Sequence, residues 1–181
     1  MHNIETERLR LRNFIEADAE GLLEYLGHPR VNCFLDDKIS TLQEAHLKIE
    51  KRSKDDSYIA VCLKESNELI GELFALKEEP DTYCIGWNFN ARCEGKGYAS
   101  ESVKALLAYL FTQMDARRLY AYVEDDNHRS QKLCERFHMR QEGCFVEFVS
   151  MTTYEDGTPK YENTFQYALL KKEWLQHQAI H

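Results

Sequence analysis

The residues best suited to chemistry form one short run, Glu94-Gly-Lys-Gly-Tyr-Ala-Ser-Glu101, between a predicted strand at 83–89 and a predicted helix. The first turn of a helix presents backbone N–H groups without partners and the positive end of the helix dipole, both of which suit a phosphate. Glycine lets the backbone approach an anion closely, and Lys96 adds a positive charge. The spacing matches neither a Walker loop nor the dinucleotide fingerprint, so a plain loop before a helix is an equally good interpretation of this run alone.

The strands and helices around this run must position it, and the spacing of apolar residues predicts where they lie. Alternation of apolar and polar residues predicts strands, and apolar stripes at helical spacing predict helices. The order is a strand, two helices, three strands, a helix, a strand, a helix and two strands. Short turns between the middle strands indicate an antiparallel meander, so the chain is predicted to be α+β. The predicted ranges are 4–14, 16–27, 40–54, 58–63, 69–76, 83–89, a helix following Gly97, 119–123, 127–137, 145–149 and 165–170.

The composition excludes several classes of function. Among 181 residues, 31 are acidic and 23 basic, and the net charge of −8 disfavours nucleic acid while accommodating a cationic partner. No apolar stretch approaches the roughly 20 residues of a membrane span, and the polar segment 1–12 is not a signal peptide. Six cysteines without CxxC or zinc spacing predict reduced thiols and no metal site. We therefore expect a cytoplasmic protein without nucleic-acid or membrane partners.

With three further segments, the glycine run resembles the GNAT N-acetyltransferases, and most closely their ribosomal-protein N-acetyltransferase branch. The opening Glu5-Thr-Glu-Arg-Leu-Arg-Leu-Arg12 is similar to the first strand of that branch. Ile85-Gly-Trp87 is similar to its fourth strand, and 124–143 resembles its Asn-x-x-Ser helix followed by Glu-Gly. These segments span most of the chain in the same order and spacing.

The resemblance implies an architecture and a reaction. The expected fold is one GNAT domain over 1–176, with a tail at 177–181. Its mixed, mostly antiparallel sheet has about seven strands and about four helices, and it is splayed between the fourth and fifth strands, where acetyl-CoA inserts. An amine attacks the acetyl carbonyl directly, and positioning supplies much of the rate. The protein is expected to be a monomer or a homodimer.

The resemblance also implies which residues hold acetyl-CoA. The pantetheine arm pairs with backbone around Phe89, and the pyrophosphate rests on the glycine loop. Asn127 and Ser130 align with positions that contact the cofactor from the next helix, although Asn127 equally fits an N-cap with Ser130 in the first turn. The loop residues concerned are Gly95, Lys96, Gly97, Tyr98 and Ala99.

The loop pattern of the wider family fits in two registers. One uses Arg92 with Gly95 and Gly97; the other uses Glu94 with Gly97 and Ala99. The second register places the helix correctly and is preferred. Its first position is then an acid instead of Gln or Arg, which weakens one side-chain contact but leaves the backbone cradle intact.

The reaction needs a base for the ammonium proton and an acid for the departing thiolate. Cys134 stands where many GNAT enzymes have tyrosine as the acid, and it is better explained by packing. The ribosomal-protein branch also lacks the tyrosine, and the resemblance implies that the serine of its Asn-x-x-Ser helix, here Ser130, is the candidate acid. Glu147 is the candidate base if it points inward; an edge-strand charge in solvent is the equal alternative. Glu72 faces either the cleft or solvent, and Cys84 stands where the family often has glutamate.

The sequence leaves the acceptor open. A protein N-terminal amine, as on ribosomal proteins, competes with small-molecule amines such as polyamines, amino acids or amine-bearing antibiotics. Two other classes remain: a non-catalytic acetyl-CoA-binding module, and a nucleotide-binding protein that uses the glycine loop for ATP phosphates. Acidic pairs at 36–37 and 125–126 are predicted to be solvated turns, or else to attract a cationic substrate at the cleft mouth.

Overall fold

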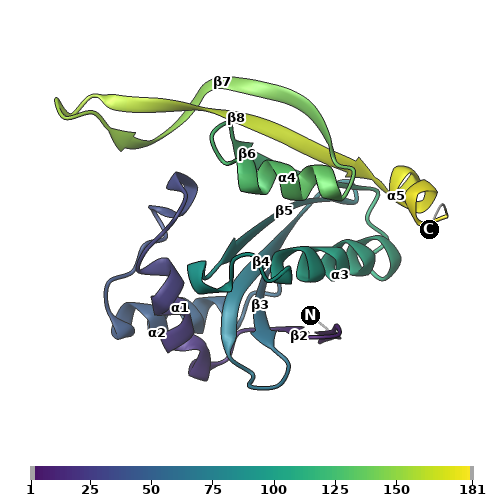
Figure 1. Cartoon of the computed structure of the whole chain (residues 1–181), viewed down its shortest axis with the longest axis horizontal. Coiled ribbons are helices and arrows are strands. Elements are labelled where there is room, and N and C mark those ends of the chain that lie inside the picture. The colour runs from purple at the N-terminus through teal and green to yellow at the C-terminus, as the bar shows by residue number, and fades with distance from the viewer. Residues whose placement is uncertain (1–2, 180–181) are drawn as a thin grey trace.

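One mixed sheet organises the chain (Figure 1). The computed structural model describes residues 3–179. In that part of the chain, eight strands lie in the order β1-β2-β3-β4-β5-β6-β8-β7, and only the β5–β6 pair is parallel. The strands are β1 (Ile4–Glu5), β2 (Leu9–Arg12), β3 (Tyr58–Leu63), β4 (Leu69–Glu78), β5 (Thr82–Phe89), β6 (Arg118–Glu124), β7 (Arg140–Thr153) and β8 (Pro159–Leu170).

Five α-helices and three short 3-10 turns complete the described chain. The apolar stripe predicted after Gly97 is buried in the third helix, as expected from its helical spacing. The helices are α1 (Ala19–Leu26), α2 (Leu42–Arg52), α3 (Tyr98–Thr112), α4 (His128–Arg136) and α5 (Lys171–Gln178), and the turns are η1 (Glu16–Asp18), η2 (Asn32–Phe34) and η3 (Ala91–Cys93).

The predicted α+β fold with a splayed sheet is confirmed. The described chain has one strand and one α-helix more than predicted. The strand predicted over 4–14 is two strands, β1 and β2, because the chain turns between them. The segment 171–178, to which no element was assigned, forms α5, whose Trp174 packs on Phe111 at 5.3 Å between ring centroids. The predicted domain boundary at 176 therefore falls inside a helix.

Strands β5 and β6 separate after a short contact. They pair in parallel only from Thr82–Cys84 to Arg118–Tyr120, although β5 continues to Phe89 and β6 to Glu124. Beyond that contact β5 stays with β4, and β6 stays with β8. Figure 1 shows the result: β6, β7, β8 and α4 diverge from the layer that holds β2–β5 and α1–α3. The divergence opens one edge of each strand to a ligand.

Two apolar clusters cover the two faces of the part of the sheet that β2–β5 form. The larger one packs α3 against the sheet through residues such as Leu106 and Phe111. The smaller one packs α1 and α2 on the other face through residues such as Leu22 and Ile49. Each buried side chain of this size contributes about 1.5–3 kcal/mol to folding. Between residues 3 and 179, no helix is long and apolar enough to cross a membrane.

Candidate active site

The glycine loop ends in a left-handed residue that begins α3. Gly95 has φ 75° and Gly97, the N-cap of α3, has φ 81°. A Cβ at Gly95 would meet nothing within 4 Å, and at Gly97 it would meet only the Arg8 guanidinium, at 3.4 Å. Backbone conformation, and not lack of space, therefore requires glycine here. The first residues of α3, whose N–H groups have no partner within the helix, line the adjacent cavity.

The N-terminal segment clasps this loop through Glu101. Thr6 Oγ1 donates to Glu101 Oε1 at 2.6 Å, and Arg8 Nε donates to Glu101 Oε2 at 2.7 Å. Arg8 Nη1 also donates to the carbonyl of Lys96 at 3.0 Å, and its guanidinium lies 4.8 Å from the ring centre of Tyr98. Two of the four segments that carry the family resemblance, 5–12 and 94–101, are thus one structural unit, in which residues near the N-terminus hold the loop in place.

A cavity of about 490 Å³ lies beside the loop, between β5, α3 and α4. The residues predicted to hold the cofactor line it, except Lys96, whose side chain is exposed outside the lining. Lys96 contributes its carbonyl to Arg8 instead. The predicted residues in the lining are Phe89, Gly95, Gly97, Tyr98, Ala99, Asn127 and Ser130.

Basic side chains that the sequence reasoning missed also line this cavity. Arg129, Lys132 and Arg136 share one face of α4 at helical spacing, and Arg30 reaches the cavity from the loop after α1. Arg136 Nη1 is bonded to Ser100 Oγ in the first turn of α3. Local positive charge thus supplements the backbone cradle in a chain of net charge −8. The helical spacing of Arg129, Lys132 and Arg136 was the feature of the sequence from which this basic face could have been predicted.

Glu94 joins two of these arginines. Its carboxylate lies 2.8 Å from Arg30 and 2.9 Å from Arg129. The acid at the first loop position, which the sequence identified as a departure from the family pattern, therefore neutralises part of the positive charge of the cavity. Any anion that binds here competes with Glu94 for both guanidinium groups.

Asn127 has the capping role that the sequence offered as the alternative to contact with the cofactor. Asn127 Oδ1 accepts a hydrogen bond from Ser130 N at 3.2 Å, which makes Asn127 the N-cap of α4. Both residues also line the cavity. Ser130 Oγ in turn accepts a hydrogen bond from Trp87 Nε1 at 3.1 Å. Because this bond occupies an acceptor position of the hydroxyl, the O–H remains available to donate.

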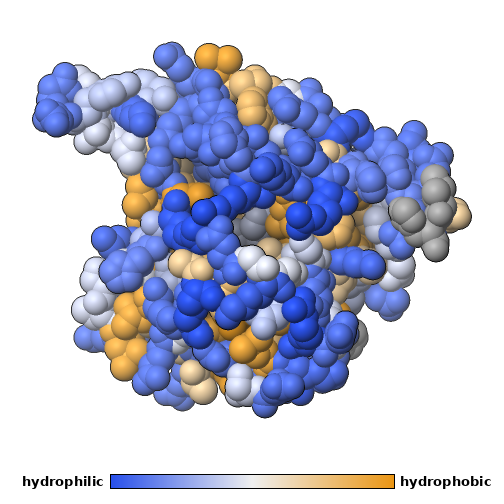
Figure 2. Space-filling model, viewed as in Figure 1, coloured by the Kyte–Doolittle hydropathy of each residue, from blue (hydrophilic) through white to orange (hydrophobic). Residues whose placement is uncertain are grey.

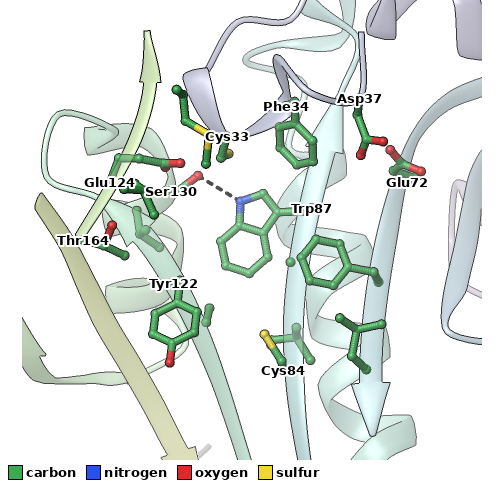
Figure 3. Close-up of a pocket in the computed structure, with 18 of the residues that line it drawn as sticks. Cys33, Phe34, Asp37, Glu72, Cys84, Trp87, Tyr122, Glu124, Ser130 and Thr164 are labelled. Atoms are coloured by element: carbon green, nitrogen blue, oxygen red, sulfur yellow. Dashed lines mark hydrogen bonds between the residues drawn. The ribbon is translucent and has the colours of Figure 1, made fainter. Parts of the chain in front are cut away.

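A second cavity, of about 380 Å³, lies on the other side of Trp87, within the splay (Figure 3). Phe34, Trp87 and Ser130 line both cavities, so the two meet there. Figure 2 shows a hollow between the upper and lower layers, with hydrophilic side chains around it and hydrophobic ones within. The arrangement brings two ligands together at the Trp87–Ser130 pair.

Glu124 supplies a buried carboxylate at one end of the second cavity. Only 7% of the residue is exposed, and it forms no ion pair with any Lys, Arg or His of the described chain. Figure 3 places it close to Ser130 and Cys33. Burial, followed by the charge of Glu124, raises the pKa of the Cys33 thiol, so this cysteine stays protonated beside the carboxylate. The sequence reasoning did not single out Glu124, since nothing local distinguishes it from the acidic residues that follow it.

The opposite end of this cavity is closed by paired charges. Glu72, 2% exposed, is bonded to Arg52, and Asp37 lies 3.6 Å from Arg52 and also pairs with Lys48. Burial raises the pKa of Glu72, while Arg52 opposes that shift. Glu72 therefore faces the cleft and not solvent, and Asp37 is partnered instead of being a free acid at the cleft mouth.

Glu147 lies elsewhere. It is exposed, has φ 49°, and sits in a bulge of β7 between Phe145 and Val149, outside the lining of both cavities. The bulge breaks the alternation on which an inward direction depended. The structure therefore favours the solvated alternative for Glu147.

Cys134 belongs to the core. It is fully buried in the apolar cluster beneath α3, and burial raises the pKa of its thiol to about 12. This agrees with packing as its role. Among residues 3–179, no group of His, Cys, Asp and Glu side chains could hold a metal ion.

Comparison with known proteins defines the class to which this site belongs. A family model described as an acetyltransferase (GNAT) domain matches residues 8–140. An uncharacterized N-acetyltransferase, YnaD, of Bacillus subtilis is 31% identical over 176 residues, which covers 96% of this chain and 99% of that protein. The chain therefore belongs to the GNAT acetyltransferase family and is an acyltransferase; the family uses acetyl-CoA as co-substrate.

Solved structures agree on the fold. A GNAT acetyltransferase from Bacillus anthracis superposes with a TM-score of 0.84 at 29% identity, covering 95% of this chain and all of that one. A putative ribosomal-protein-serine acetyltransferase from Vibrio cholerae has a TM-score of 0.74 at 21% identity, covering 93% and 97%. The latter likeness concerns the fold alone.

Proposed function

We propose that this enzyme transfers the acetyl group of acetyl-CoA to a primary amine held in the cavity of the splay. The observation that carries the proposal is the meeting of two chemically different cavities at Trp87 and Ser130. One cavity is basic and suits a polyanion, and the other contains an unpaired buried carboxylate that suits an ammonium group.

The groups that line the basic cavity suit both the phosphates and the pantetheine arm of CoA. The N–H groups at the start of α3 and the cations of α4 would hold the phosphates. After Cys84, β5 has no neighbour on the side facing β6, so its backbone to Phe89 is free to pair with the pantetheine amides. The predicted contacts of Gly95, Gly97 and Asn127 agree with this placement.

Glu124 would act as the general base and Ser130 as the general acid. Glu124 accepts one proton from the ammonium group, which leaves a neutral amine able to attack the acetyl carbon. As the carbon–sulfur bond breaks, Ser130 donates its proton to the thiolate and recovers one from the acetylated nitrogen. The amide and the free thiol are the products, and Glu124 returns its proton to solvent. This assignment replaces Glu147 with Glu124 as the base.

The experiment is a thiol-release assay with acetyl-CoA over a panel of amines that contains peptides with free N-termini, polyamines and hydrophobic monoamines. Transfer to any of them supports the proposal. Tight acetyl-CoA binding without turnover on any amine would favour the non-catalytic module. A thermal shift with ATP but none with CoA would favour the nucleotide-binding alternative.

A further inference from the structure

The walls of the second cavity are largely apolar, and about half of the apolar side chains are aromatic. Side chains of both layers contribute, and Tyr122 and Phe148 lie 6.0 Å apart between ring centroids. Both rings are partly exposed, so apolar surface is available for a ligand to cover. The residues that form these walls include Phe34, Phe74, Leu76, Trp87, Tyr122 and Phe148.

Only one end of this cavity offers an uncompensated charge. Glu124 has no cationic partner in the described chain, and a buried carboxylate in that state favours a bound cation. At the other end, Glu72 and Asp37 are already neutralised by Arg52 and Lys48. A second ammonium group placed there would meet a cluster without net charge, in which the Oε1 atom of Glu72 is a buried acceptor without a partner among residues 3–179, and this one acceptor replaces only part of the lost hydration.

The walls also disfavour a peptide. Only the open backbone edges of β5 and β6 could bond its amide groups, and each amide that lies against a ring face without a hydrogen bond costs about 1–3 kcal/mol. Of the polar groups in the lining, Tyr122 Oη already accepts from Gln166 at 3.4 Å, and Ser130 Oγ accepts from Trp87. A cavity of about 380 Å³ is moreover at the small end of the range for small-molecule sites.

We propose that the acceptor is a hydrophobic primary monoamine, with one ammonium group on a compact aryl or branched alkyl body. The ammonium group lies at Glu124, next to Ser130, and the body lies between Trp87 and Tyr122. This inference rests on the proposed acetyl transfer and adds the class of amine to it.

The first test compares kcat/KM for three acceptors with acetyl-CoA saturating. They are 2-phenylethylamine, spermidine and a tetrapeptide with a free N-terminal serine. The expected result is a kcat/KM for 2-phenylethylamine at least tenfold above each of the others. An equal or higher value for spermidine or for the peptide overturns the monoamine proposal, while it still supports acetyl transfer.

The second test measures binding without chemistry. Calorimetry of 2-phenylethylamine is carried out on the protein saturated with CoA, for the wild type, Glu124→Gln and the control Asp126→Asn, an exposed acid two residues away. We expect Glu124→Gln to weaken amine binding at least tenfold without changing the Kd of CoA, and Asp126→Asn to change neither. Equal weakening in both variants, or in neither, contradicts the site.

The two proposals fail in different ways. Binding of 2-phenylethylamine that depends on Glu124, without turnover on any amine, supports the cavity assignment and overturns acetyl transfer. Absence of both binding and turnover overturns both proposals. Thermal unfolding of each variant checks that the fold is retained, and Glu124→Gln is nearly isosteric.

Discussion

Two side-chain interactions lie at positions that matter for the proposed reaction. Trp87 donates to Ser130 where the two cavities meet, and Glu94 pairs with Arg30 and Arg129 beside the glycine loop. The first interaction orients the hydroxyl of Ser130, and the second reduces the positive charge that the cavity offers to an anion. Each can be removed by a single substitution, which keeps an aromatic ring at position 87 and the shape of the side chain at position 94.

Trp87→Phe removes the indole N–H and keeps an aromatic wall. The hydroxyl of Ser130 then loses the donor that orients it, so we expect kcat to fall about tenfold, or ~1.4 kcal/mol, with the Kd of acetyl-CoA within about twofold of the wild type. Trp174→Phe, the matched control on α5, leaves kcat unchanged. Combining Trp87→Phe with Ser130→Ala adds no further loss if Trp87 acts through Ser130; additive losses would show that it acts only as a wall.

Glu94→Gln frees Arg30 and Arg129 for the phosphates of CoA. Since the carboxylate competes with those phosphates, the Kd of CoA measured by calorimetry is expected to fall about threefold to tenfold. Glu68→Gln, which removes an acid paired with Arg92 outside the cavity, serves as control and leaves the Kd unchanged. A weaker affinity in Glu94→Gln would mean that Glu94 holds the arginines in their binding positions.

At the scale of elements, the N-terminus of α3 and the divergence of β5 from β6 form the site. The helix begins at a left-handed glycine, and the strands separate after Cys84 because each follows a different neighbour. Helix α4 then brings its basic face to the opening. The helix and the two strands supply backbone N–H and C=O groups to the site, and the side chains that face the cavity supply its charge.

Gly97→Ala tests the start of α3. A Cβ at φ 81° costs roughly 1–2 kcal/mol in backbone strain, so the loop relaxes and the affinity for CoA is expected to fall about tenfold. Gly157→Ala has nearly the same φ, 82°, in the turn between β7 and β8, far from the loop in sequence. It is expected to lower the free energy of unfolding by a similar amount in urea denaturation while leaving CoA binding unchanged. Equal losses of affinity in the two variants would contradict the role of the loop.

For the whole molecule, the clasp between the N-terminal segment and α3 joins distant parts of the chain. Burial opposes ionisation of Glu101, but hydrogen bonds from Thr6 and Arg8 outweigh it and lower the pKa of the carboxyl below its ordinary 4.5. The ionised form is therefore stabilised by folding. That stability is present above pH 4.5 and is lost as the pH falls through the lower pKa of the folded state.

Glu101→Gln should consequently lower Tm at pH 7 by about 3 °C. The difference from the wild type should shrink as the pH falls below 4.5 and through the lowered pKa of the folded state, where the wild-type carboxyl becomes protonated. Differential scanning calorimetry across that range gives the measurement. Glu65→Gln, an exposed acid that lines neither cavity, serves as control and shows no such pH-dependent difference. A constant difference at all pH values would mean that the charge of Glu101 is not what stabilises the clasp.

The amino-acid sequence alone determined the fold class, the family and the loop that begins α3, because glycine positions and helical periodicity are local properties. It also identified Ser130, which the tertiary structure places against Trp87. It could not reveal that Glu124 and Arg30 belong to the site, since their surroundings come from elements distant in the chain; the basic face of α4 could be predicted from its spacing, but the cavity that it lines could not. Only the tertiary structure decided that Glu147 lies in a bulge, that Glu72 is paired, and that Glu124 lines the cavity without a cationic partner in the described chain. The physical reason is that strand alternation specifies two faces, but packing decides which face is covered and which charges meet.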